Sequence, residues 1–270
     1  MTHVCPSRPR GTARYWLLTI AVAMAHLPAA ADPITVRHRE GTIHGFVLVR
    51  TSEEKTLATG DVIQTVNGAR VTSELVLHFF DGSLYEETTV FEQHSVFRLV
   101  SDHLRQEGPS FPDPVDAIID TAGKVTVRSG KGEEKSYQLK IPDDAANGLL
   151  FIIMKNLPTL DTDTSVSLVA TSSKPRVVKF HIRPSGTQLF TVGGPERKAV
   201  HLVGHTDIPG VAGALAHVTG KQPPDVDFWI VQGKAPAFVK FRGPLYDQGP
   251  LWSVELTSPK LEDRATGSQP

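Results

Sequence analysis

Three consecutive strand-like segments in the first half of the chain carry the side chains best suited to chemistry. They read RVTSELVLHFF, LYEETTVFEQ and SVFRLV, and they are rich in Val, Thr, Phe and Tyr, which favour strands. The pair Asp81-Gly82 predicts a two-residue turn between the first two segments, and Gln93-His94 predicts the next turn. With these turns, one face of the sheet gathers polar side chains from all three strands. They are Glu74, His78, Tyr85, Glu87, Arg98 and Asp102.

This mixed face has two interpretations. A solvated surface with cross-strand ion pairs, such as Glu87 with Arg98, accounts for it, because an antiparallel sheet commonly exposes one face to water. The alternative is a polar cluster in the mouth of a barrel that positions the head group of a ligand. Its candidate binding residues are Glu74, His78, Tyr85, Glu87 and Arg98. A shift of one residue in register would separate these side chains.

No signature of catalysis or metal binding accompanies the cluster. The sequence lacks Gly-x-Ser-x-Gly, His-Glu-x-x-His and a glycine-rich phosphate loop that leads into a helix. His201 and His205 lie in a strand-like segment, where four residues span about 13 Å, too far for the two rings to share one ion. We therefore predict no catalytic residue, no metal site and no cofactor.

The stretch LATGDVIQTVNGARV, residues 57–71, resembles part of a PDZ domain. A PDZ domain also needs an upstream glycine-containing loop that binds a peptide carboxylate and, after this stretch, a helix beside the peptide groove. No such loop precedes the stretch, and the residues that follow it run directly into the Asp81-Gly82 turn. Two strands joined at Asn67-Gly68 explain the pattern better than PDZ-like peptide binding.

The first 31 residues are typical of a cleaved signal peptide. Three arginines precede an apolar run at residues 15–25, and Ala29-Ala30-Ala31 supplies small residues for cleavage. The run is shorter than the roughly 20 residues that span a bilayer, and no other stretch is longer. We expect an exported protein, periplasmic or extracellular in a bacterium, without an integral membrane span.

Composition restricts the mature chain further. The one cysteine, Cys5, would leave with the signal peptide, which excludes disulfides, zinc-thiolate sites and cysteine nucleophiles. Removing Arg8, Arg10 and Arg14 from the 28 basic residues leaves 25, against 29 acidic ones. This acidic balance argues against a nucleic-acid partner.

The remaining chain alternates strand-like segments with turns from residue 34 to about residue 257. After Pro142, Asp143 or Asp144 is suited to cap a helix that ends before Pro158 and is apolar nearly all round, so it needs cover. Aromatic residues of the last third are candidates for the core or for the lining of an apolar cavity: Phe228, Trp229, Phe238, Phe241, Tyr246 and Trp252. We predict a single β-rich domain at residues 32–261 and a disordered tail at residues 262–270. The fold class is mostly β, a large antiparallel curled sheet or open barrel with one or two short helices.

Much of the chain resembles a family of exported, β-rich bacterial proteins with no known activity. The resemblance covers HGFVLVR, the run RVTSELVLHFFDGSLYEETTVFEQHSVFRLVSDHLRQEGPSFPDP, PDDAANGLL, and GKQPPD with the following FWIVQGKAPAFVKFRGPLYDQGPLW. It implies an exported fold similar to open barrels that hold apolar molecules, and it implies no residue roles.

Export, the β-rich pattern and the apolar run at residues 149–154 favour a non-catalytic carrier or sensor of an apolar or amphipathic small molecule. The alternative is a structural or protein-interaction protein of the cell envelope, which a filled interior would favour. A hydrolase of unfamiliar type is a third possibility, which a pocket with converging Glu, His and Asp would favour. No motif identifies a protein partner.

Overall fold

The computed structural model describes Met1 and residues 33–130, 132–157, 162–172, 174–191, 196–208, 210 and 222–257. The predicted signal peptide beyond Met1 and the tail at residues 262–270 lie outside the described residues. So does most of the glycine-rich stretch that follows Asp207. Among the described residues, no helix is long and apolar enough to cross a membrane.

In the described part of the chain, fourteen strands form one antiparallel sheet, which confirms the predicted fold class. The first half is a meander in which each strand pairs with the next. Its strands are β1 (Ile43–Arg50), β2 (Thr56–Asn67), β3 (Arg70–Phe79), β4 (Leu84–Gln93), β5 (Phe97–Glu107), β6 (Val115–Asp120), β7 (Lys124–Ser129) and β8 (Lys135–Gln138).

The second half is also a meander, and it follows helix α1 (Leu150–Lys155). Its strands are β9 (Thr164–Ala170), β10 (Arg176–Phe190), β11 (Arg197–Asp207), β12 (Val226–Val231), β13 (Ala237–Gly243) and β14 (Trp252–Thr257). The two halves join where the first strand pairs with the last, β1 with β14, so β8 and β9 are the two edges of the sheet. No backbone pairing between β8 and β9 closes the sheet, which is therefore an open barrel.

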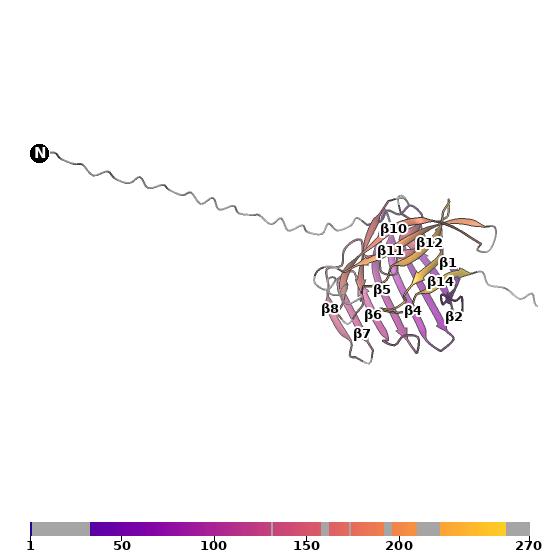
Figure 1. The fold of residues 1–270 in the computed structure, drawn as a ribbon, viewed down its shortest axis with the longest axis horizontal. Coiled ribbons are helices and arrows are strands. Elements are labelled where there is room, and N and C mark those ends of the chain that lie inside the picture. The colour runs from indigo at the N-terminus through magenta and orange to yellow at the C-terminus, as the bar shows by residue number, and fades with distance from the viewer. Residues whose placement is uncertain are drawn as a thin grey trace, which may run out of the picture.

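The sheet curls so that its two halves face each other across a common core (Figure 1). Phe91 of β4 and Phe228 of β12 belong to the same buried cluster, although they lie far apart in the strand order. Near the edges, Val169 of β9 packs with Ile119 of β6 and Val125 of β7 in a second cluster. The ends of the sheet thus meet through apolar side chains, which pack there without the backbone ladder of a closed barrel.

The turn between β3 and β4 differs from the predicted two-residue turn. A two-residue type I′ turn needs positive φ at both central residues, but Gly82 has φ 88° and Asp81 does not have positive φ. Asp81 instead accepts a hydrogen bond from the backbone N–H of Ser83 at 2.9 Å. The loop holds three residues, 80–82, and Phe79 donates its backbone N–H to the carbonyl of Ser83.

This extra loop residue shifts the pairing of β3 with β4 by one position. Tyr85 lies opposite Leu77, where the two-residue turn would have placed it opposite His78. The predicted turn at Gln93-His94 is also wrong, because Gln93 pairs with Phe97 and a bulge follows at Val90/Phe91. Because side chains alternate between faces, these shifts redistribute the predicted polar cluster.

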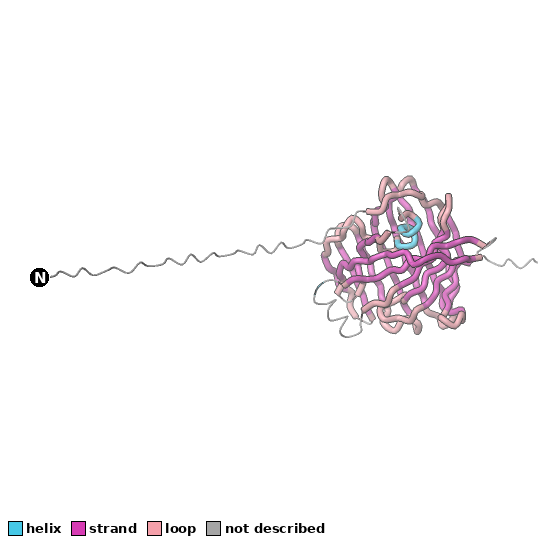
Figure 2. Tube along the Cα trace, turned by 45° about the horizontal axis from the view of Figure 1, so that its top comes forward, coloured by secondary structure: helices cyan, strands magenta, loops and turns pink. Residues whose placement is uncertain are grey.

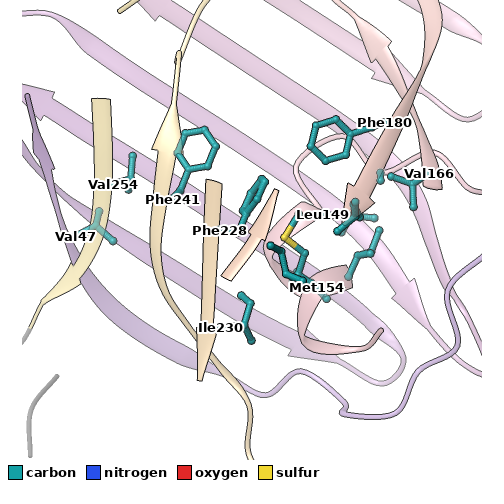
Figure 3. Close-up of a cluster of buried hydrophobic side chains, with 14 of the residues drawn as sticks. Val47, Leu149, Met154, Val166, Phe180, Phe228, Ile230, Phe241 and Val254 are labelled. Atoms are coloured by element: carbon teal, nitrogen blue, oxygen red, sulfur yellow. The ribbon is translucent and has the colours of Figure 1, made fainter. Parts of the chain in front are cut away.

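Residues 144–157, here called the interior segment, lie inside the curl (Figure 2). The predicted helix begins later than expected, at Leu150, because Gly148 has φ 64°, a conformation incompatible with a right-handed helix. The apolar side chains of α1 pack into the main cluster, so the expected cover is present. Figure 3 shows Leu149 and Met154 of this segment beside Phe228.

Side-chain amides hold the interior segment at both ends. Asn147 binds the edge of β9 that has no neighbouring strand among the described residues, accepting a hydrogen bond from the N–H of Val169 at 2.8 Å and donating one to its carbonyl at 2.9 Å. Asn156 accepts hydrogen bonds from the backbone N–H groups of Arg37 and His38. The segment is therefore fixed to an edge strand at one end and to the start of the described chain at the other.

Candidate ligand-binding site

The structure separates the five predicted binding residues. Tyr85 and Glu87 of β4 point into the curl, where Tyr85 is buried and Glu87 is half-buried. Glu74 and His78 of β3 are exposed on the outer face. Arg98 of β5 also lies outside and forms an ion pair with Asp143 at 3.0 Å. Tyr85 and Glu87 remain together because they lie two residues apart on one strand. The one-residue shift at the first turn separates them from Glu74 and His78, and the different second turn, which places Arg98 opposite Glu92, separates them from Arg98.

Tyr85 and Glu87 form a hydrogen-bonded pair on the inner face of β4. The phenol of Tyr85 donates to Oε2 of Glu87 at 2.9 Å. Burial raises the pKa of Tyr85 well above its ordinary value, so the phenol stays a proton donor. Burial also raises the pKa of Glu87, and the hydrogen bond from Tyr85 opposes that increase.

A second carboxyl group lies one pair further along the same face. Asp102 of β5 is opposite Thr89 and accepts a hydrogen bond from its hydroxyl at 2.8 Å. Asp102 is 2% exposed. Burial, and then the negative charge of Glu87, raise the pKa of Asp102 well above its ordinary value. Two carboxyl groups therefore compete for ionisation inside the curl.

Gly148 of the interior segment covers this second carboxyl group. A Cβ added to Gly148 would overlap Oγ1 of Thr89 and lie 2.8 Å from Oδ1 of Asp102. The absence of a side chain at Gly148 thus lets the backbone approach β4 and β5 closely. This contact places the start of α1 directly beside the carboxyl groups.

A pocket of about 160 Å³ opens between β3–β4, the interior segment and β12–β14. Most of its lining is apolar, and Tyr85 and Glu87 supply its polar side chains. The lining consists of Leu75, Tyr85, Glu87, Gly148, Leu150, Phe151, Phe228, Phe241, Pro244, Leu245 and Val254. Among these described residues, none carries a positive charge.

Phenylalanine rings form one wall of the pocket. The ring centroid of Phe151 lies 5.9 Å from that of Phe228 and 6.0 Å from that of Phe241, with interplanar angles of 64° and 72°. Such edge-to-face contacts are a favoured arrangement of aromatic pairs and fix the orientation of the rings. The loop that carries Pro244 and Leu245 is tied to β5, because Gln106 donates to the carbonyl of Leu245.

The sequence pattern indicated part of this lining. The aromatic residues of the last third were candidates for an apolar cavity, and Phe228 and Phe241 do line the pocket. No sequence signal joined them to Tyr85 and Glu87, since the contact depends on the curl of the whole sheet. Gly148 was also not predicted, although a glycine inside an apolar helical pattern is itself a signal of close approach or of a break.

A buried polar network elsewhere in the interior segment has a structural role. Asp144, whose side chain is fully buried, forms an ion pair with Lys179 at 3.1 Å and accepts a hydrogen bond from Ser167 at 3.0 Å. Lys179 also donates to the hydroxyl of Ser167. A lysine beside a serine hydroxyl is the arrangement of some nucleophilic sites, but Ser167 is fully buried and Asp144 neutralises the lysine. The network joins the interior segment to β9 and β10.

The two histidines considered for metal binding lie on β11 and have separate partners. His201 contacts Asp227 at 2.7 Å, and His205 contacts Asp225 at 2.6 Å. The described residues contain no group of three or more His, Cys, Asp or Glu side chains placed to hold a metal ion.

Fold and site together define a barrel-like protein: an open antiparallel sheet that curls around an interior segment and leaves an apolar pocket beside it. No family model matches the sequence, and no curated protein does. Among solved structures, the chain is similar to a β-barrel-like protein of the domain of unknown function DUF1849 from Brucella abortus. The TM-score is 0.46 and the sequence identity 11%, over 82% of this chain and 98% of that chain.

Proposed function

We propose that this protein is a carrier or sensor of an apolar or amphipathic small molecule, which it binds in the pocket beside α1. One observation carries the proposal: a pocket with mostly apolar walls contains a single hydrogen-bonded polar pair, Tyr85 with Glu87. Ligand sites in proteins commonly combine apolar walls with a few oriented polar groups. The apolar part of the molecule lies against the phenylalanine wall, and its polar end meets Glu87.

The size of the pocket limits what it holds as it stands. An engineered cavity of about 150 Å³ binds benzene, so a pocket of about 160 Å³ accepts a ring or a short piece of an alkyl chain. A longer molecule, such as one with a chain of ten carbon atoms, binds with displacement of Leu150 and Phe151, which lie on the six-residue helix α1. A helix this short depends on its tertiary contacts for stability, and it is therefore the element best suited to move.

The same proposal includes export, based on the signal-peptide pattern of residues 1–31. Cleavage after Ala31 yields a mature chain that begins at Asp32. Sequencing the amino terminus of the protein recovered from its native cell tests this directly. Recovery of an intact chain that begins at Met1 would contradict export through a cleaved signal.

Mass spectrometry of the protein, purified from its native cell without detergent, tests the ligand. We expect the native spectrum to contain a bound small molecule that organic solvent releases. Leu150→Trp fills the pocket and should abolish the bound mass, whereas Ile118→Trp, on the exposed outer face of β6, should retain it. A protein that carries no small molecule, or a bound mass that Leu150→Trp leaves unchanged, would contradict the proposal.

One observation favours a second function, that of a structural or protein-interaction protein of the cell envelope. The interior segment fills much of the curl, with Leu149, Ile152, Ile153 and Met154 all buried in the main cluster. A mainly filled interior leaves the outer surface as the functional part. A protein that retains no small molecule under the conditions above, yet copurifies with one partner through its outer face, would favour this second function.

A further inference from the structure

We propose that the polar end of the ligand is an ammonium group, bound by Glu87 with the pocket's aromatic rings around it. This inference rests on the proposed function, since it specifies the chemistry of a molecule held in the same pocket. It follows from three features of the site: its charge, its aromatic wall and the hydrogen bonding of its carboxyl groups.

The charge of the pocket is unbalanced. Glu87 lines it, Asp102 lies close enough to Glu87 for the charge of one to raise the pKa of the other, and none of the described lining residues is basic. An ionised carboxylate in an apolar environment is unfavourable unless a positive group pairs with it. A ligand cation supplies that partner, whereas a carboxylate or phosphate on the ligand would add a third negative group.

The aromatic wall favours the same class of ligand. Phe151, Phe228 and Phe241 line the pocket with Tyr85, so a bound group lies against several aromatic rings. Cations are attracted to aromatic ring faces, and quaternary ammonium ligands are commonly bound in aromatic cages. An ammonium group on an apolar chain therefore matches both the wall and the carboxylate.

Glu87 can accept a hydrogen bond from a ligand in addition to the one from Tyr85. Tyr85 donates to one oxygen, Oε2, and a carboxylate can accept several hydrogen bonds on its two oxygens. The Tyr85 hydrogen bond also favours the ionised form of Glu87, which is the form that pairs with a cation. Tyr85 is thus a positioning residue for the carboxylate.

Three probes of equal chain length separate this inference from the proposed function: decylammonium, decanol and decanoate. Each is titrated into the mature protein at pH 7.5 by calorimetry, below the concentration at which the probe aggregates. We expect decylammonium to bind about tenfold more tightly than decanol, and decanoate to bind most weakly. Decanol binding equal to or tighter than decylammonium binding, or decanoate as the tightest probe, would overturn the ammonium inference and leave the pocket proposal standing.

Binding of none of the three probes would overturn both proposals. Glu87→Gln should reduce the affinity for decylammonium by about tenfold and leave decanol binding within roughly twofold. Glu74→Gln, which removes an exposed carboxylate from the outer face of β3, is the matched control and should change neither value. If Glu74→Gln weakens decylammonium binding as much as Glu87→Gln does, the cation binds through overall charge and the inference is wrong. If Glu87→Gln does not fold, the ranking of the three probes on the unaltered protein still decides it.

Discussion

The phenol of Tyr85 donates a hydrogen bond of 2.9 Å to Glu87, two residues further along the inner face of β4. The two side chains come from adjacent inward positions of one strand, so their contact needs no other element to form. The curl of the sheet then places the pair in an apolar pocket, where burial opposes ionisation of the carboxyl group. The balance between that burial and the hydrogen bond determines the charge of the site.

Tyr85→Phe tests this balance. The substitution removes the hydroxyl and keeps the ring, so the pKa of Glu87 should rise, because the lost hydrogen bond favoured the ionised form. We also expect the free energy of unfolding to fall by about 1–2 kcal/mol at neutral pH. Carbon-13 NMR of the glutamate carboxyl groups measures the titration. An unchanged or lower pKa for Glu87 would show that the hydrogen bond does not stabilise its charge.

Asp102 should make the protein less stable as the pH rises. Its pKa is raised in the folded state, so the folded chain holds this proton to higher pH than the unfolded chain does. The contribution to stability is therefore fully present below the ordinary carboxyl pKa of about 4 and is lost as the pH rises through the raised folded value.

Asp102→Asn removes that dependence and keeps an oxygen to accept from Thr89. We expect the variant to be more stable than the parent by about 1–2 kcal/mol at pH 7, with a smaller difference at pH 4. Urea denaturation at several pH values measures it. Asp113→Asn, at an exposed loop position, is the control and should reproduce the parent's profile. A variant that is less stable than the parent at pH 7 would contradict the assignment of a buried, destabilising charge.

Gly148 and Gly68 allow a matched test of close packing. Both have φ 64°, but a Cβ at Gly148 would overlap Thr89, whereas a Cβ at Gly68 would meet nothing within 4 Å. Gly68→Ala should therefore cost only the backbone strain of about 1 kcal/mol. Gly148→Ala should cost about 3 kcal/mol or more, because the interior segment must move away from β4. Equal costs in thermal or urea denaturation would show that the interior segment is not held against β4.

Lys179 tests whether the interior segment is anchored by a buried ion pair. Lys179→Met leaves Asp144, whose side chain is 0% exposed, without its cation, so we expect a loss of about 3–5 kcal/mol. Adding Asp144→Asn should recover part of this loss, since the unpaired charge is removed. Arg70→Met, which breaks an exposed pair with Glu92, should cost at most about 1 kcal/mol. A loss from Lys179→Met no larger than this control would contradict the anchoring role.

The sheet could be predicted from sequence because its signals are local. Alternating apolar residues and turn residues identified the strands. Asn67-Gly68 predicted a tight turn between β2 and β3, but the two turn residues are Gly68 and Ala69, because Asn67 pairs with Arg70. The prediction of which side chains point to the inner face was wrong in part, because it depends on the exact length of each turn. Asp81-Gly82 also suits a three-residue loop, and the single added residue moved Tyr85 and Glu87 to the inner face while Glu74 and His78 stayed outside.

The pocket could not be predicted, because its walls meet only through long-range curvature. Glu87 and Phe228 are separated along the chain by most of the sheet, and nothing in either local pattern specifies their distance. The interior segment was expected to need cover, but its position depends on Gly148 and on the amide of Asn147 at the edge of β9. Strand pairing thus follows from local pattern, whereas the site follows from how far the sheet closes.

Solution NMR with decanol tests the central claim, that the protein binds an apolar molecule inside its curled sheet, most directly. Methyl groups of Leu75, Leu150 and Val254, which line the pocket, should show intermolecular contacts with the decanol chain and saturable shifts. The methyl groups of Ile118, on the outer face, should show neither. Contacts confined to the outer face, or no saturable shift at the pocket methyl groups, would contradict the account.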